Sequence, residues 1–157
     1  MKYLIIILFF GILASCSIKL QQTVLDLSDG KVDKYYKRQY NTEKYTSLDL
    51  DNNNLKTIPE FVWDFKNLKT LRLMNNQIDS LPASIDKLQK LKYINLARNR
   101  LNQINKSLSN LETLRVIILI DNPLSIEEYE KLKLAVNDSC LIVIAYEFIE
   151  YPPYKKK

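Results

Sequence analysis

This 157-residue sequence has no histidine and only two glycines. Without histidine it cannot form a Ser-His or Cys-His nucleophile pair or a His-ligated zinc site. Two glycines are too few for the glycine-rich loops that hold nucleotide phosphates. These absences argue against most enzyme classes. We therefore predict a binding or scaffolding protein rather than an enzyme, with no cofactor and no metal site.

The positive charge of the chain is concentrated at its two ends. The sequence has 23 basic and 18 acidic residues, a net charge of +5, but the last three residues are all lysine and Lys2 lies in a segment that we expect to be removed. Without these four residues, 19 basic residues remain against 18 acidic ones. Nucleic-acid-binding domains usually carry clustered positive charge. We therefore do not expect nucleic acid as a partner.

The N-terminus carries a short apolar segment that ends at a cysteine. Lys2 precedes an apolar run over residues 4–13, and the sequence Leu-Ala-Ser-Cys follows, ending at Cys16. A basic residue, a short apolar run and small residues before a cleavage site are typical of a secretory signal. The run is too short to span a bilayer as a helix. We predict that residues 1–15 are a signal peptide.

The Leu-Ala-Ser-Cys sequence resembles the lipobox of bacterial lipoproteins. In that family the cysteine thiol is joined to diacylglycerol and the signal peptide is cut just before it. The resemblance implies that Cys16 is lipidated and anchors the chain in the bacterial cell envelope. Ser17 favours the outer membrane, because an aspartate there tends to retain Gram-negative lipoproteins in the inner membrane. The alternative is an ordinary secretory signal in which Cys16 stands by chance.

The rest of the chain repeats with a period of 23 residues. Two columns of apolar residues stand two positions apart, and an asparagine column follows three positions later. Their members are Leu48, Leu71, Ile94 and Ile117; Leu50, Leu73, Leu96 and Leu119; and Asn53, Asn76, Asn99 and Asn122. Apolar residues two apart point to one face of a strand, and an asparagine side chain can satisfy backbone groups inside a turn. The fixed period indicates stacked coils.

The repeating unit, L-x-x-L-x-L-x-x-N-x-L, resembles the leucine-rich repeat family in its bacterial 23-residue form. Residues 81–91 match the phrase LPxxIxxLxxL of that form, and the resemblance covers residues 45–124, which we interpret as four repeats. It implies an α/β fold: a solenoid with a parallel β-sheet on the concave face and short helical or irregular segments on the convex face. It also implies binding of a protein through the concave face.

The coils at the two ends are less regular. Residues 16–44 are predicted to hold the lipid anchor, a short linker and a degenerate N-terminal cap repeat, in which Gly30 replaces the asparagine. Within it, Lys34–Tyr40 mixes basic and aromatic residues. We favour a solvated back of the cap for this segment over contact with lipid headgroups.

Residues 125–148 are predicted to form a C-terminal capping helix and strand, followed by a flexible basic tail over residues 149–157. Ser125 and Glu128 have the spacing of a capping box that starts the helix. The 23-residue frame places Cys140 and Ile142 in the apolar columns of Ile117 and Leu119. We expect Cys140 to be a buried thiol, and lipidation of Cys16 would leave it without a disulfide partner.

Residues that alternate with the apolar columns should face outward and line the concave face. Their character changes along the stack, from acidic in the first coils to apolar in the last ones, and contiguous exposed apolar residues tend to mark contact sites. The candidate partner-binding residues are Asp49, Asp51, Arg72, Tyr93, Asn95, Ile118, Ile120, Leu141 and Val143.

The function that we favour is a membrane-anchored leucine-rich repeat lipoprotein that binds an unidentified protein through its concave face. The alternative is a structural envelope protein that self-associates through the apolar end. A further alternative is that the tail, through Phe148 and Tyr151, folds back and covers the apolar residues.

Overall fold

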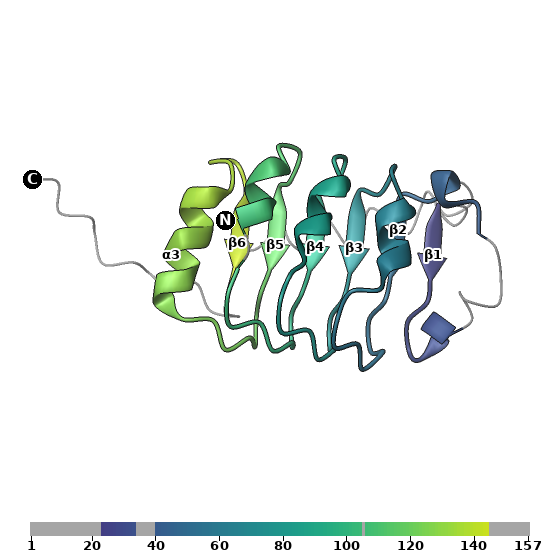
Figure 1. Cartoon of the computed structure of the whole chain (residues 1–157), viewed down its shortest axis with the longest axis horizontal. Coiled ribbons are helices and arrows are strands. Elements are labelled where there is room, and N and C mark those ends of the chain that lie inside the picture. The colour runs from purple at the N-terminus through teal and green to yellow at the C-terminus, as the bar shows by residue number, and fades with distance from the viewer. Residues whose placement is uncertain (1–22, 34–39, 105, 145–157) are drawn as a thin grey trace, which may run out of the picture.

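Six three-residue strands lie side by side in one parallel sheet (Figure 1). The computed structural model describes residues 23–33, 40–104 and 106–144. The order of the strands in the sheet follows their order in the chain. The strands are β1 (Val24–Asp26), β2 (Ser47–Asp49), β3 (Thr70–Arg72), β4 (Tyr93–Asn95), β5 (Val116–Ile118) and β6 (Leu141–Val143).

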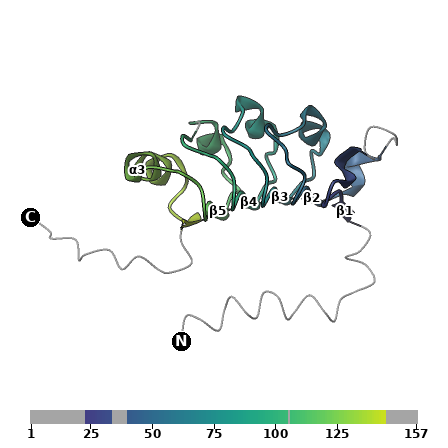
Figure 2. The ribbon, with the colours of Figure 1, turned by 90° about the horizontal axis from the view of Figure 1, so that it is seen from below.

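Short helical segments return the chain from the end of one strand to the start of the next. Figure 2 shows the strands along one side of the molecule and these segments along the other. They are the 3₁₀ helices η3 (Thr42–Lys44), η4 (Glu60–Asp64), η5 (Ala83–Lys87) and η6 (Lys106–Asn110), and the α-helix α3 (Ile126–Ala135). The predicted fold class, a leucine-rich repeat solenoid with a parallel sheet, is confirmed.

The 23-residue columns become rungs of the sheet. Leu48 pairs with Leu71, and Leu71 with Ile94, so the first apolar column is a line of Cα partners. All three side chains are fully buried. The return segments fill the other side of the core, with Val62 from η4 and Ile85 from η5 both at 0% exposure. A three-residue strand cannot bury a face alone, so the stacking of coils forms the core.

The asparagine column holds neighbouring coils together from inside the turns. The Asn76 side-chain nitrogen Nδ2 donates to the carbonyl oxygens of Leu50 and Leu73 at 2.9 and 3.0 Å, and its Oδ1 accepts from the N–H of Leu55 at 2.9 Å. Asn99 repeats both donations one coil later. Because Leu50 belongs to the preceding coil, each amide satisfies backbone groups of two coils that water cannot reach.

The first coil joins the stack through β1. Leu25 and Leu27 are buried, and β1 pairs with β2 in the same 23-residue register. Gly30 stands where later coils have asparagine, and its φ of +77° is a conformation that glycine adopts without strain. Asn53 of the next coil donates to the carbonyl oxygen of Leu27 at 2.8 Å, so the first coil is tied to the second.

Helix α3 replaces the 3₁₀ segment in the last coil. Ser125 caps it, since its Oγ accepts from the N–H of Glu128 at 3.2 Å. The Glu128 carboxylate accepts from the N–H of Ile104 at 3.1 Å and from Lys131. The reciprocal half of the predicted capping box is therefore replaced by a bond to the preceding coil.

The last strand is shifted by two residues from the predicted register. Ile117 pairs with Ile142, which makes the final repeat 25 residues long instead of 23. Cys140 therefore aligns with Arg115 instead of Ile117, and the prediction that it occupies that apolar column was wrong. Its side chain is half-buried against the core, and this burial raises the pKa of the Cys140 thiol. The extra residues accommodate an α-helix, which rises less per residue than a 3₁₀ helix.

Candidate functional site: the outer face of the sheet

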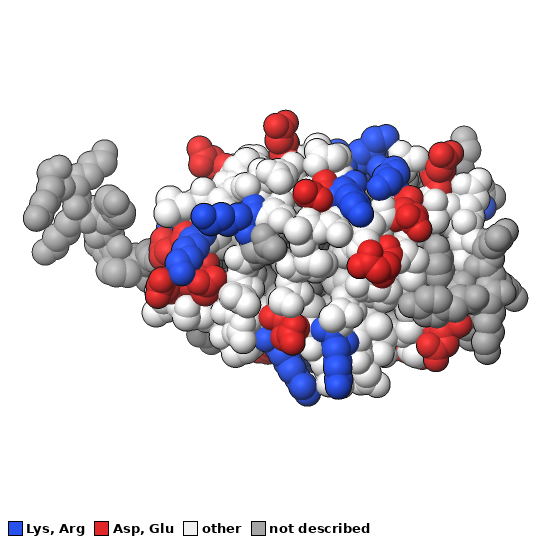
Figure 3. Space-filling view, viewed as in Figure 1, with Lys and Arg blue, Asp and Glu red and all other residues white. Residues whose placement is uncertain are grey.

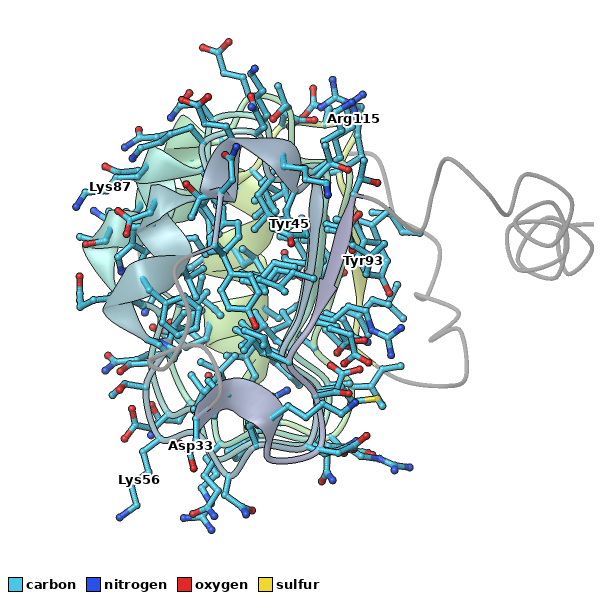
Figure 4. The ribbon with its side chains drawn as sticks, turned by 90° about the vertical axis from the view of Figure 1, so that its right-hand side faces the viewer. Asp33, Tyr45, Lys56, Lys87, Tyr93 and Arg115 are labelled. Atoms are coloured by element: carbon cyan, nitrogen blue, oxygen red, sulfur yellow. The ribbon has the colours of Figure 1, made fainter. Side chains whose placement is uncertain are left out.

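Two rows of side chains form the outer face of the sheet, which we call the sheet surface. In every strand the middle residue points into the core, so the first and third residues point outward. Figure 4 shows Tyr93 on this side and Lys87 on the opposite side. The first row is Val24, Ser47, Thr70, Tyr93, Val116 and Leu141, and the second row is Asp26, Asp49, Arg72, Asn95, Ile118 and Val143.

Asp51 and Ile120 do not belong to this surface. Both were expected to face outward, but their residues are only 2% and 8% exposed, and Ala97 in the same column is 4% exposed. The expectation assumed that residues alternate between inward and outward through position 51 and position 120. It fails because β2 and β5 end two residues before these positions. Past that point the chain turns inward. The other seven candidate residues lie on the sheet surface.

Asp51 has a structural role at the end of β3. In three coils, the side chain of the third strand residue accepts a hydrogen bond from the N–H two positions later. In β2 this residue is Asp49, whose Oδ1 accepts from the N–H of Asp51 at 3.0 Å. Arg72 occupies this column in β3 and has no acceptor. Asp51 Oδ1 accepts the N–H of Met74 at 2.7 Å instead, while its Oδ2 binds the guanidinium of Arg72 at 2.5 Å.

This exchange was readable from the sequence. Asp26, Asp49, Arg72 and Asn95 form one column, and arginine is the only one of the four that cannot accept a hydrogen bond. The buried carboxylate of Asp51 compensates, because it accepts the N–H that Arg72 cannot accept and pairs with the arginine charge. Arg72 also approaches Asp49 Oδ2 at 3.4 Å, so its charge is shared between two carboxylates.

The N-terminal half of the sheet surface is charged and hydrogen-bonded. Donation from Ser28, with Lys31 at 3.1 Å, lowers the pKa of Asp26 to about 2. Asp49 differs, because partial burial raises its pKa by more than the N–H bond from Asp51 lowers it. These carboxylates and Arg72 compensate one another, so this half carries an internally paired polar network.

The C-terminal half of the sheet surface is apolar. Ile118 pairs with Val143, and Val116 with Leu141, which places four aliphatic side chains together across β5 and β6. Leu141 is 54% exposed, and the other three are partly exposed. Tyr93 extends the patch into β4, where burial raises the pKa of its hydroxyl. We call these five residues the apolar patch.

Other parts of the surface lack this separation. Figure 3, in the view of Figure 1, shows acidic and basic side chains interspersed. Two hollows in the described ranges are shallow; one, of about 300 Å³, is lined by residues such as Ile58, Pro59 and Pro82 at the turns. In residues 23–33, 40–104 and 106–144, no three acidic or cysteine side chains are grouped to hold a metal ion.

Several predictions concern residues outside the described ranges. They include the signal peptide 1–15, lipidation at Cys16, the segment 34–39 and the tail residues Phe148 and Tyr151. Among the helices that are described, none has the length and apolar character needed to cross a bilayer.

The comparisons with known proteins identify the repeat. A model of leucine-rich repeats matches residues 66–124, and a model of two leucine-rich repeat copies matches residues 43–85. Together they cover just over half of the chain. The chain is a leucine-rich repeat protein. Leucine-rich repeat domains commonly serve as protein-interaction modules, and the family is typically non-enzymatic.

Solved leucine-rich repeat structures from two bacteria resemble this one. A leucine-rich repeat protein of Leptospira interrogans is 31% identical with a TM-score of 0.60, covering 63% of this chain and 25% of its own. An internalin of Listeria monocytogenes is 25% identical with a TM-score of 0.56, covering 68% and 30%. This chain thus spans less than a third of the length of either protein. The comparison with curated proteins gives no match.

Proposed function

We propose that this leucine-rich repeat protein is anchored to a membrane through Cys16 and binds another protein through the apolar patch of its sheet surface. The observation that carries the proposal is the separation on one face between a paired polar half and an apolar half. Exposed aliphatic side chains that lie together in register are a typical feature of protein-contact sites. The polar half supplies a charged rim beside them.

The coil-to-coil comparison shows which substitutions the strands tolerate. Asn95 stands one coil before Ile118, and its Oδ1 accepts the N–H two residues later at 3.0 Å. Ile118→Asn therefore copies a side chain that this sheet already holds. Leu141→Ser likewise copies Ser47 of the first row. Both remove apolar surface from the patch while keeping the backbone geometry.

The test compares these variants in capture from the native membrane. The double variant Ile118→Asn/Leu141→Ser is expected to lose a protein that the wild-type chain retains. The control is Leu134→Gln, which removes an aliphatic side chain that is 87% exposed on α3 and lies away from the sheet. Equal loss with the control, or full retention by the double variant, would refute a role for the patch.

Lipidation is tested separately by mass spectrometry of the membrane-extracted protein. We expect a mature chain that begins at Cys16 and carries acyl chains, and we expect Cys16→Ser to release the protein from the membrane. Two or three acyl chains would anchor it firmly, since each buried CH₂ contributes about 0.8 kcal/mol. A chain with an unmodified Cys16 thiol would show that the anchor is absent.

Self-association is the second outcome that the patch could support. Sedimentation of the non-lipidated Cys16→Ser chain distinguishes it from binding to another protein. We expect a monomer. Concentration-dependent dimers that Ile118→Asn abolishes would instead favour the structural alternative.

A further inference from the structure

A row of three basic residues stands immediately before three consecutive strands. Lys69, Lys92 and Arg115 each precede the first residue of β3, β4 or β5, and all three are exposed. Their backbones are neighbouring rungs, since the N–H of Lys92 donates to the carbonyl oxygen of Lys69 at 2.9 Å, and that of Arg115 to Lys92 at 2.8 Å. With about 4.8 Å between strands, the backbone positions of the three residues span about 10 Å.

These three cations have no carboxylate partner among the residues that the structure describes. Two cations near the ends of the strands are paired, Lys31 with Asp26 and Arg98 with Asp121. Like charges in adjacent rungs repel one another and lower the stability of the fold. An anionic surface laid across the strand starts would neutralise all three at once.

The chain enters the sheet at this same edge. Thr23 precedes β1, and its carbonyl oxygen accepts from the N–H groups of Thr46 and Ser47 at 2.9 and 3.1 Å. In a parallel sheet, the starts of all strands share one edge, so Thr23 and the basic row lie along it. Figure 4 shows Arg115 at one edge of the coils and Lys56 and Asp33 at the other.

We propose that the strand-start edge of the solenoid, through Lys69, Lys92 and Arg115, rests on an anionic lipid surface beside the anchored Cys16. This inference rests on the proposed lipid anchor. Six residues, 17–22, separate Cys16 from Thr23, and even a fully extended chain over these seven steps spans only about 25 Å. The anchor therefore keeps this edge near the bilayer, where each basic side chain adds attraction to anionic headgroups. The strands then run roughly perpendicular to the membrane plane, and the sheet surface remains open to a partner.

Vesicle binding of the mature Cys16→Ser chain, residues 16–157, tests the contribution of the row without the lipid. The vesicles contain phosphatidylcholine with 30% phosphatidylglycerol, and pure phosphatidylcholine vesicles serve as the uncharged comparison. Lys69→Gln/Lys92→Gln is expected to weaken binding to the anionic vesicles about 25-fold at low salt, about fivefold for each residue. The C-terminal lysines are present in every variant, so their contribution cancels.

The matched control is Lys56→Gln/Arg100→Gln, which removes the same charge from exposed residues at the turns after the strands. We expect it to weaken binding no more than twofold. Equal weakening by both double variants would show a non-specific charge effect and overturn the proposal. Wild-type binding to soluble heparin but not to anionic vesicles would also overturn it, because the row would then favour a polyanion.

Orientation on the membrane is a second, independent measurement. In lipidated chains with Cys140→Ala, a fluorophore is placed at Thr113→Cys, near the strand starts, or at Asp79→Cys, near the strand ends. Energy transfer to headgroup acceptors should be stronger from residue 113, and Lys69→Gln/Lys92→Gln should reduce the difference. No difference between the sites would contradict the proposed orientation. Neither experiment needs the protein partner, so failure here is distinct from failure of the protein-binding proposal.

Discussion

The buried amide of Asn76 provides a quantitative test of how the coils are held together. Asn76→Asp keeps the shape of the side chain but places an oxygen where Nδ2 donates to Leu50 and Leu73 at 2.9 and 3.0 Å. At neutral pH a carboxylate would face two carbonyl oxygens in a site that is 7% exposed. Each unsatisfied buried carbonyl costs about 1–3 kcal/mol.

We expect Asn76→Asp to lower the free energy of unfolding by about 3–5 kcal/mol at pH 7, which is a large share of the about 5–15 kcal/mol of a typical domain. Urea unfolding followed by circular dichroism measures this loss. Asn75→Asp is the matched control, because Asn75 is exposed and its Nδ2 bonds only to Asn52. The control should lose no more than about 1 kcal/mol.

The loss should also depend on pH. Burial against carbonyl oxygens raises the pKa of an aspartate at position 76 above its unfolded value of about 3.9. The destabilisation relative to the wild type is then full above the folded pKa and shrinks as the pH falls toward 3.9. A loss equal to that of Asn75→Asp, or a loss of the same size at pH 7 and pH 4.5, would refute the assigned role of the amide.

Three other predictions concern single columns of the repeat and are measured by urea unfolding. Breaking the buried pair by Asp51→Ala or Arg72→Asn should cost about 2–4 kcal/mol each. The double variant should cost less than about 1.5 kcal/mol, because the asparagine introduced at position 72 can accept the N–H of Met74 as Asn95 accepts that of Ala97. Additive losses would contradict the pairing. Arg98 has a φ of +55°, which asparagine adopts more readily than arginine. Arg98→Asn should therefore stabilise the fold by about 0.5 kcal/mol, although it removes the exposed ion pair with Asp121. The control Arg100→Asn should give no such gain. The pKa of Asp26 is lowered to about 2, so its contribution to stability is present above about pH 4 and lost toward pH 2. Asp26→Asn should remove this part of the acid dependence, which is less than about 1 kcal/mol for an exposed group. An unchanged dependence of stability on pH would contradict the prediction.

The repeat made most of the fold predictable. Leu48 and its column had to share a face, and Asn76 had to turn inward, because period and alternation fix both. The return segments and the helix start at Ser125 followed from prolines and capping residues. These features depend on local spacing, which a sequence displays directly.

The features that the sequence did not predict depend on where each strand ends and on contacts between coils. Asp51 and Ile120 were assigned to the surface because alternation was extended past three-residue strands. The register of Cys140 was wrong because an α-helix in the last coil adds two residues to the period. The bond from Glu128 to Ile104 joins two coils and has no local sequence signal.

Photo-crosslinking in intact cells tests the central claim most directly. A photoreactive amino acid is placed at Ile118 on the apolar patch, and in a separate chain at Lys87 on the opposite side, as Figure 4 shows for Lys87. The account predicts a discrete adduct with another protein from position 118 and none from position 87. Adducts of equal yield from both positions, or adducts from position 87 alone, would contradict binding through the sheet surface.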